Sequence, residues 1–135
     1  MGEAAAPTAG PAIDVHGLVK RYGRRTVVDQ VNLTLAPGRI CGFLGPNGSG
    51  KTTMLRLICG LLTPDAGHGT CLGQDLIAGR DAIKRQTGYM TQRFGLYEDL
   101  SIRENLEFVG RVYGLERLAR RVDGALERLG LATRQ

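Results

Sequence analysis

The sequence predicts an α/β fold, and two patterns along the chain lead to this prediction. Apolar residues alternate with polar ones in residues 13–35, which is typical of strands that bury one face. Residues 45–50 are rich in glycine and lie between a short β-like run and a segment with helical apolar spacing. We therefore expect an N-terminal antiparallel β region, then a unit of strand, loop and helix, and then a helical part.

The β region is expected to begin after a tail. Residues 1–12 consist mainly of Ala, Gly and Pro, and we expect them to be disordered. The first strand begins near Ile13, residues 21–25 form a polar turn, and residues 26–35 supply one or two further strands. The predicted folded region therefore spans residues 13–135.

A helix is predicted over residues 51–62, directly after the glycine-rich segment. Its apolar residues fall at the spacing of one helix face and are Met54, Leu57, Ile58 and Leu61. Pro64 and Gly67 are expected to end it. The run before the glycines, residues 39–44, is predicted to be a strand.

Shorter elements are predicted next. Residues 70–72 form the centre of a strand, residues 79–86 a short helix or turn, and residues 87–91 another strand. A loop then begins at Gln92.

Two helices are predicted near the C-terminal end. Ser101 and Glu104 have the S-x-x-E spacing of a capping box, which marks the start of an amphipathic helix. Gly114 closes that helix, and a second one spans about residues 116–129 and ends at Gly130. The two are expected to pair.

Composition excludes several classes of protein. The chain has 135 residues, of which 42% are hydrophobic and 23% charged, as in an ordinary globular domain. Its richest apolar stretch, residues 54–62, is interrupted by Arg56, so an integral membrane span is not expected. The first dozen residues lack the basic and apolar regions of a secretory signal.

Charge and cysteine content give two further expectations. There are 18 Lys and Arg against 13 Asp and Glu, a net charge of +5, but the basic residues are mixed with acidic ones along the predicted helices. We therefore expect no nucleic-acid partner. Cys41, Cys59 and Cys71 are odd in number and lack C-x-x-C spacing, so we expect three small buried residues without a disulfide or zinc site.

Residues 45–52, with the sequence GPNGSGKT, match the pattern G-x-x-x-x-G-K-[ST] of a phosphate-binding loop. Glycines let successive backbone N–H groups point inward toward an anion, and the start of a helix adds further N–H donors. The ammonium group of Lys51 can reach the β- and γ-phosphates, while the Thr52 hydroxyl can bind Mg²⁺. The alternative, a flexible glycine loop with this pattern, arises by chance in about one of two hundred chains this long. A nucleotide-phosphate site is therefore predicted.

Three segments resemble, in order, motifs of ATP-binding-cassette (ABC) ATPases. Residues 45–53, GPNGSGKTT, resemble their Walker A sequence, and Tyr22 in the run KRYG resembles their adenine-stacking aromatic residue. Gln92, at the end of YMTQ, resembles the glutamine of their Q-loop. The resemblance covers residues 13–135 and implies an incomplete P-loop NTPase fold of the ABC ATPase type.

The resemblance implies roles for individual residues and the cofactors ATP and Mg²⁺. Lys51 and Gln92 are the expected catalytic residues, and Thr52 and Gln92 the expected metal ligands. An amide oxygen such as that of Gln92 can accept from water or coordinate a metal without adding a charge. The nucleotide-binding residues implied are Tyr22, Gly45, Pro46, Asn47, Gly48, Ser49, Gly50, Lys51, Thr52 and Thr53.

The segment after Gln92 resembles the export-type branch of the family, which includes drug-efflux ATPases. Phe94, Leu96 and Tyr97 place apolar groups in a loop, which indicates a partner surface. In the family this region receives a helix of the transmembrane permease subunit, on the cytoplasmic face of the membrane. The alternative is a small local core beneath the helix capped at Ser101.

Several family motifs do not occur within residues 1–135. These are the LSGGQ-type signature, the Walker B strand with its catalytic Glu, and the switch His. We therefore expect this chain to be the N-terminal part of a cassette that can bind ATP but does not hydrolyse it alone. Without a Walker B strand, residues 39–44 would form an unpaired apolar edge.

Three interpretations follow. The first is a part of a transporter's ATP-binding subunit, which would pair head to tail with a second such subunit. The second is a short, non-catalytic chain that binds nucleotide or a membrane partner as a decoy. The third is part of a soluble ABC ATPase, and the Phe94 to Leu100 segment favours the transporter over it.

Overall fold

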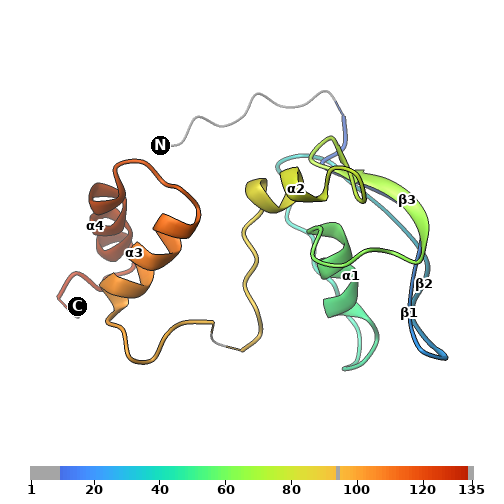
Figure 1. Ribbon diagram of the computed structural model, residues 1–135, viewed down its shortest axis with the longest axis horizontal. Coiled ribbons are helices and arrows are strands. Elements are labelled where there is room, and N and C mark those ends of the chain that lie inside the picture. Colours follow the sequence, from blue (N-terminus) through green and yellow to red (C-terminus); the bar gives the residue numbers. More distant parts are fainter. Residues whose placement is uncertain (1–9, 94, 134–135) are drawn as a thin grey trace. The chain divides into compact units, whose positions relative to one another are not determined.

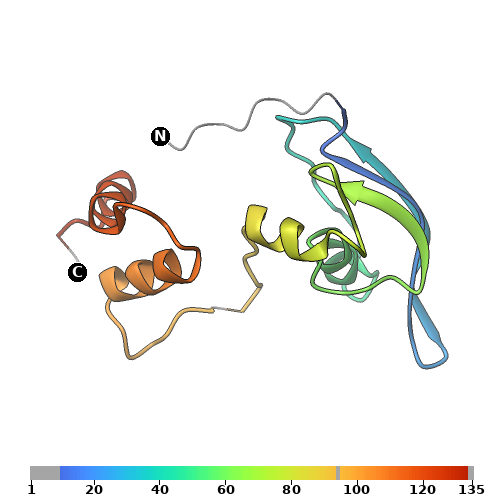
Figure 2. The same cartoon turned by 45° about the horizontal axis from the view of Figure 1, so that its top comes forward.

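The structure, a computed structural model, describes residues 10–93 and 95–133. The chain divides into two units, Met1–Tyr89 and Met90–Gln135. The first unit holds a sheet and two helices, and the second holds two further helices (Figures 1 and 2). The mixed content confirms the predicted α/β fold class, whereas most of the predicted disordered tail, residues 1–9, lies outside the described residues.

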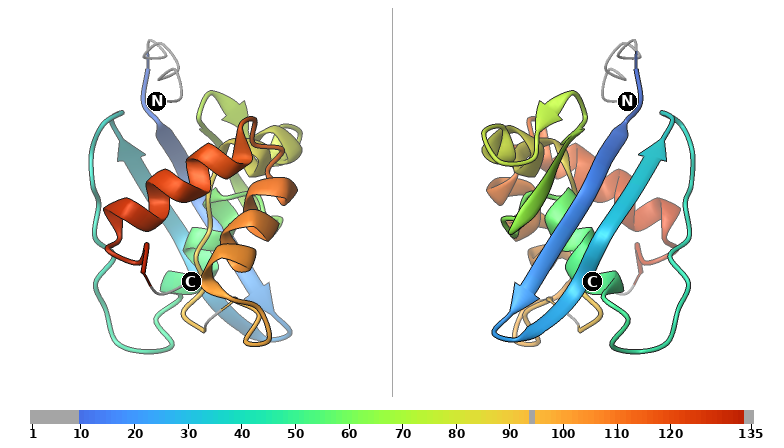
Figure 3. Two further views of the ribbon diagram at one scale, coloured as in Figure 1. Left: turned by 90° about the vertical axis from the view of Figure 1, so that its left-hand side faces the viewer. Right: turned by 90° about the vertical axis from the view of Figure 1, so that its right-hand side faces the viewer.

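A four-stranded antiparallel sheet forms the first unit's framework. β1 (Ile13–Tyr22) and β2 (Arg25–Leu35) make the long predicted hairpin, which Figure 3 shows from both sides. β3 (Ala66–Cys71) pairs with the other edge of β1, and the short β4 (Gln74–Asp75) pairs with β3. The strand order is β2-β1-β3-β4.

β1 contains an irregularity that decides which residues face the core. Its register with β2 shifts between Val15 and Leu18, and Gly17 between them adopts a φ of 60°, which glycine tolerates without a Cβ clash. In a regular strand, residues three positions apart face opposite sides of the sheet. Because of the shift, Val15 and Leu18 face the same side, and both are fully buried.

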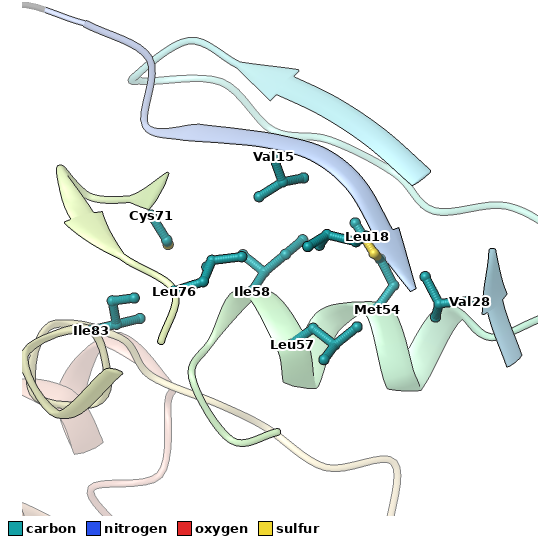
Figure 4. Packing of buried hydrophobic residues seen from close by; sticks show 9 residues of the cluster. All are labelled: Val15, Leu18, Val28, Met54, Leu57, Ile58, Cys71, Leu76 and Ile83. Atoms are coloured by element: carbon teal, nitrogen blue, oxygen red, sulfur yellow. The ribbon is translucent and has the colours of Figure 1, made fainter. Parts of the chain in front are cut away.

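The core lies between one face of the sheet and two helices. α1 (Lys51–Ile58) and α2 (Arg80–Gln86) pack their apolar residues against β1, β2 and the β3–β4 region (Figure 4). The buried cluster consists of Val15, Leu18, Val28, Met54, Leu57, Ile58, Cys71, Leu76 and Ile83. Three residues of the predicted helical stripe are therefore confirmed as core, while the fourth, Leu61, is 39% exposed.

Leu61 is exposed because α1 ends one turn earlier than predicted. Gly60 has a φ of 73°, its N–H donates to Leu57 O, and the N–H of Leu61 donates to Arg56 O. These two bonds form a Schellman motif, in which a left-handed glycine closes the helix. The helix therefore ends at Ile58, before the predicted stop signals Pro64 and Gly67 are reached.

The strand predicted over residues 39–44 is not present. A strand is defined by its ladder, and these residues pair with no other segment within the part of the chain that the structure describes. Ile40 and Leu44 are almost completely exposed, and Phe43 packs against the core cluster. The run therefore presents an unpaired apolar surface.

The predictions for residues 70–91 are partly correct. The strand centred on residues 70–72 begins earlier, at Ala66, and α2 agrees with the predicted short helix. The strand predicted over residues 87–91 is wrong. Its first residue, Thr87, instead caps α2, and its hydroxyl donates to Ile83 O at 2.9 Å.

The cysteine prediction is wrong for two of three residues. Cys71 is buried, but Cys59 at the end of α1 is only partly covered and Cys41 is exposed. Cys41 lies in the unpaired run, where no neighbouring strand covers it. Burial raises the pKa of the Cys71 thiol to about 11, so this thiol stays protonated at neutral pH.

The second unit contains the two predicted helices, α3 (Ile102–Val112) and α4 (Leu118–Arg128). The capping box is confirmed: the Ser101 hydroxyl accepts from the N–H of Glu104, whose carboxylate accepts from the N–H of Ser101. Gly114 and Gly130 end the helices in Schellman geometry, as predicted.

Candidate nucleotide-binding site

The phosphate loop is a turn leading into α1. Within it, the N–H of Ser49 donates to Pro46 O at 3.2 Å. Gly48 and Gly50 have φ values of 82° and 91°, a conformation that residues with a Cβ rarely adopt. Glycine at positions 48 and 50 is therefore required by the backbone itself.

Gly50 is also required by its contact with the hairpin. A Cβ built on Gly50 would lie 2.4 Å from Val27 O in β2, closer than real atoms approach. The loop can pass this strand only because residue 50 has no side chain. This close approach places the phosphate loop beside β2, at the end of the first unit where the hairpin turns (Figure 1).

The start of α1 offers unused backbone donors. Gly50 is the N-cap and supplies no side-chain cap, the first turn contains no acidic residue, and the first helical bond joins Met54 N to Gly50 O. The N–H groups of Lys51, Thr52 and Thr53 precede that bond, so they can bind an anion together with the positive end of the helix dipole.

Lys51 brings a positive charge over this loop. Its ammonium group donates to Gly45 O, across the loop from its own Cα. Among the described residues, no carboxylate lies within 4.0 Å of this ammonium group, so no acidic side chain neutralises it. The arrangement of N–H donors and one cation fits a polyphosphate.

Arg25 is a second cation at the loop, and sequence reasoning missed it. Its guanidinium Nη2 donates to Gly48 O at 3.4 Å. Arg25 also pairs with Tyr22 across the hairpin turn, so it connects the phosphate loop to the predicted adenine-stacking residue. A basic residue at the end of the predicted polar turn was the only signal in the sequence.

Tyr22 is available for stacking. Its side chain is 49% exposed, and the Lys20 ammonium group lies 5.8 Å from its ring centroid. The Tyr22 ring can therefore receive a planar ligand on its exposed side. Tyr22 and the phosphate loop are the two predicted parts of a nucleotide site, and Arg25 contacts both of them.

The residues present fit a magnesium ion held mainly by the nucleotide. No group of three His, Cys, Asp or Glu residues that could hold a metal occurs in the described parts of the chain. Mg²⁺ is commonly bound by few protein oxygens together with phosphate oxygens. Thr52 is exposed at the first turn of α1 and offers one such hydroxyl oxygen.

Gln92 lies in the second unit, in an exposed bend. Beside it, the Thr91 hydroxyl donates to Arg93 O. The phosphate loop belongs to the first unit, so the meeting of Gln92 with the magnesium site stays a prediction.

The three residues of the predicted partner surface differ in what the structure describes of them. Phe94 lies outside the described residues. Leu96 is 57% exposed, and Tyr97 is 53% exposed while its ring packs edge-on against Phe108, with centroids 5.1 Å apart. Tyr97 thus takes part in a local cluster and still presents half of its surface to solvent.

Asn105 shapes this loop, and no role was predicted for it from the sequence. It is 7% exposed, its Oδ1 accepts from Tyr97 N at 2.9 Å, and its Nδ2 donates to Tyr97 O at 3.0 Å. Nδ2 also lies within bonding distance of Leu100 O and Ser101 O. One buried amide therefore fixes the backbone between the loop and α3.

No helix in the described residues has the length and apolar content needed to span a membrane.

The sequence profile of the family described as ABC transporter matches residues 28–135. A relative from Escherichia coli strain K12, the "Probable multidrug ABC transporter ATP-binding protein YbhF", is 42% identical over 103 residues, covering 76% of this chain and 18% of the relative.

A second relative and one solved structure cover more of the chain. "Daunorubicin resistance ATP-binding protein DrrA3" of Streptomyces coeruleorubidus is 42% identical over 126 residues, covering 92% of this chain and 40% of the relative. "Structure of ATP binding subunit of ABC transporter" aligns with a TM-score of 0.77 and 30% identity, covering 91% of this chain and 52% of that one. This chain thus spans 40% or less of these two curated relatives.

Proposed function

Because this chain belongs to the ABC transporter family of ATP-binding proteins, we propose that its phosphate loop binds ATP for a membrane transporter. The observation that carries the proposal is the loop geometry, with Gly48 and Gly50 in left-handed conformations and Lys51 placed across the loop. Such a loop binds polyphosphates through backbone N–H groups and a point charge.

ATP would be held at two ends. The loop and the first turn of α1 bind the phosphates, with the Lys51 ammonium group moving from Gly45 O to the β- and γ-phosphates. The adenine stacks on the exposed ring of Tyr22. Thr52 and Gln92 are the residues proposed to hold Mg²⁺, which would neutralise phosphate charge.

Hydrolysis requires more than these residues. Gln92 can orient a water molecule through its amide, but it is not a base that removes a proton from water. The 135 residues contain neither the LSGGQ-type signature nor a Walker B run. We therefore expect this chain alone to bind ATP without turnover, and the whole protein to hydrolyse ATP as a head-to-tail dimer.

Coupling to transport is assigned to the loop after Gln92. Leu96 and Tyr97 expose apolar surface there, and with Phe94 they would receive a helix of the permease subunit on the cytoplasmic face of the membrane. The direction proposed is export, which the names of the multidrug and daunorubicin-resistance relatives support.

Titration calorimetry with ATP and Mg²⁺ tests the binding proposal. Lys51→Ala removes one charge-assisted contact of roughly 1.5 to 3 kcal/mol, so we expect affinity to fall by about 10- to 100-fold. Lys84→Ala is the control, because Lys84 lies on α2 and pairs with Asp81 rather than with the loop. Equal affinity of the Lys51 variant and the wild type would contradict the proposal.

Co-purification with the permease tests the coupling proposal in the whole protein. Tyr97→Ser removes an aromatic group from the exposed loop, so we expect weaker recovery of the membrane subunit. Tyr113→Ser, at a similarly exposed tyrosine after α3, is the control. If the Tyr97 variant recovers as much permease as the wild type, the loop is not the contact surface.

A further inference from the structure

Asp65 extends the edge of β3 beyond its last pair with β1. That pair joins Val19 to Ala66, and the backbone N–H of Asp65 donates to Val19 O at 2.8 Å. The carboxylate Oδ2 of Asp65 then accepts from the N–H of Arg21 at 2.6 Å. The side chain thus binds a strand N–H that lies past the end of the ladder.

Lys20 forms a second contact between β1 and the segment that precedes β3. Its ammonium group donates to Thr63 O at 2.9 Å and lies 3.6 Å from Asp65 Oδ1. Its side chain is only 16% exposed, and the same ammonium group lies 5.8 Å from the Tyr22 ring centroid. The segment after α1 therefore holds two consecutive residues of β1 directly before Tyr22.

These contacts of Asp65 and Lys20 matter because, at the end of the hairpin, β1 has a neighbouring strand on one side only. β3 begins opposite Val19, so residues 20–22 have ladder pairs with β2 alone. A two-stranded ribbon is marginally stable in water. Contacts from outside the ribbon are needed to keep the Tyr22 ring in one place.

We propose that Asp65 is a positioning residue that holds Tyr22 as a platform for the nucleobase. The proposal rests on the proposed ATP site and adds to it a residue that touches neither base nor phosphate. Asp65 fixes the Arg21 N–H and orients the Lys20 ammonium group, and these fix the strand end that carries Tyr22. Within the described residues, Asp65 bonds to Val19, Lys20 and Arg21 and makes no direct bond to the phosphate loop.

The test separates the base from the phosphates by comparing two ligands. Affinities for ATP and for inorganic tripolyphosphate are measured on the full chain, as wild type and as Asp65→Ala, Tyr22→Ala and the double variant. The control is Asp75→Ala, because Asp75 also accepts from backbone N–H groups in this unit, those of Ile77 and Ala78. Thermal unfolding of every variant shows whether it is folded.

We expect Asp65→Ala and Tyr22→Ala each to weaken ATP binding by about 2- to 10-fold, the range of one aromatic stacking contact. Tripolyphosphate binding should stay unchanged, and the double variant should bind ATP as Tyr22→Ala does, because both changes remove the same contact. Asp75→Ala should lower stability without changing the ratio of the two affinities. Asp65→Asn keeps an oxygen for the Arg21 N–H and should restore most of the ATP affinity, including where Asp65→Ala does not fold.

Other outcomes overturn the inference. Equal loss of ATP and tripolyphosphate affinity in the Asp65 variants would mean a general structural role, and losses that add in the double variant would mean independent roles. An Asp65→Asn variant as weak as Tyr22→Ala would show that the bond to Arg21 is not what matters. If the wild type binds neither ligand, the proposed function itself fails; if it binds both and only the Asp65 effect is absent, the function stands without this inference.

Discussion

Gly50 lies where the phosphate loop passes β2. Adding a Cβ atom at this position tests whether the loop needs its close approach to Val27. Gly50→Ala places a methyl group 2.4 Å from Val27 O, in a conformation with a φ of 91°. The left-handed conformation alone costs about 1 to 2 kcal/mol for an alanine, and the clash adds to this. We expect a lower melting temperature and at least about a tenfold loss of ATP affinity, measured by thermal unfolding and calorimetry.

Gly42→Ala is the matched control for this change. A Cβ at Gly42 would meet nothing within 4 Å, and its backbone is not in the left-handed region. We expect stability and ATP affinity close to those of the wild type. A Gly50→Ala variant that behaves like Gly42→Ala would show that the loop can form without the close approach to Val27.

At the scale of one element, the capping box of α3 predicts a pH dependence. The N–H and hydroxyl of Ser101 hold the pKa of the Glu104 carboxyl below its ordinary value. A carboxyl with a lowered folded pKa adds stability above its unfolded pKa of about 4.3, and that stability is lost as the pH falls through the folded pKa. Glu104→Gln keeps an acceptor without the charge. We expect the wild type to melt higher than this variant at pH 7, and the difference to shrink as the pH falls below the unfolded pKa and through the lower folded pKa.

Asp81→Asn is the control for that experiment, because Asp81 also lies in the first turn of a helix but α2 has no side-chain cap bond. A Glu104→Gln difference that stays constant from pH 7 to pH 3 would mean that the charge of the capping carboxylate does not stabilise α3.

The elements also show which structural features local sequence can predict. Gly114, Gly130 and the S-x-x-E spacing act within one helix turn, so the sequence alone located these helix ends. Gly60 also acts within one helix turn, but the prediction took Pro64 and Gly67, which lie further along the chain, as the residues that end α1. Local signals therefore predicted that a glycine or proline ends each helix, but they placed the end of α1 too late.

Features that depend on distant partners were harder to predict. A strand at residues 39–44 depends on a neighbour elsewhere in the chain, and its apolar composition could not supply one. Likewise, the phosphate-loop residues follow a fixed spacing, whereas Arg25, Asp65 and Asn105 act across 23, 44 and 8 positions. The site's motif was predictable, and the residues that support it from other segments were not.

At the scale of the whole molecule, residues 39–44 predict how the 135-residue chain behaves in solution. Ile40 and Leu44 are 103% and 96% exposed, within an apolar run with no charge between residues 40 and 44. Short exposed runs of this composition associate through unpaired backbone groups. We expect the purified chain to form oligomers or aggregates that grow with concentration, measured by light scattering and sedimentation velocity.

A single charge in that run should oppose the association. Ile40→Lys places a charge on the unpaired surface, and because the Ile40 side chain is fully exposed, the core is not disturbed. Ile77→Lys, at a half-exposed apolar residue outside the run, is the control and should leave aggregation unchanged. If the wild-type chain is monomeric and melts cooperatively with coincident probes, the run does not drive association. If both lysine variants are equally soluble, net charge rather than the run at residues 39–44 controls solubility.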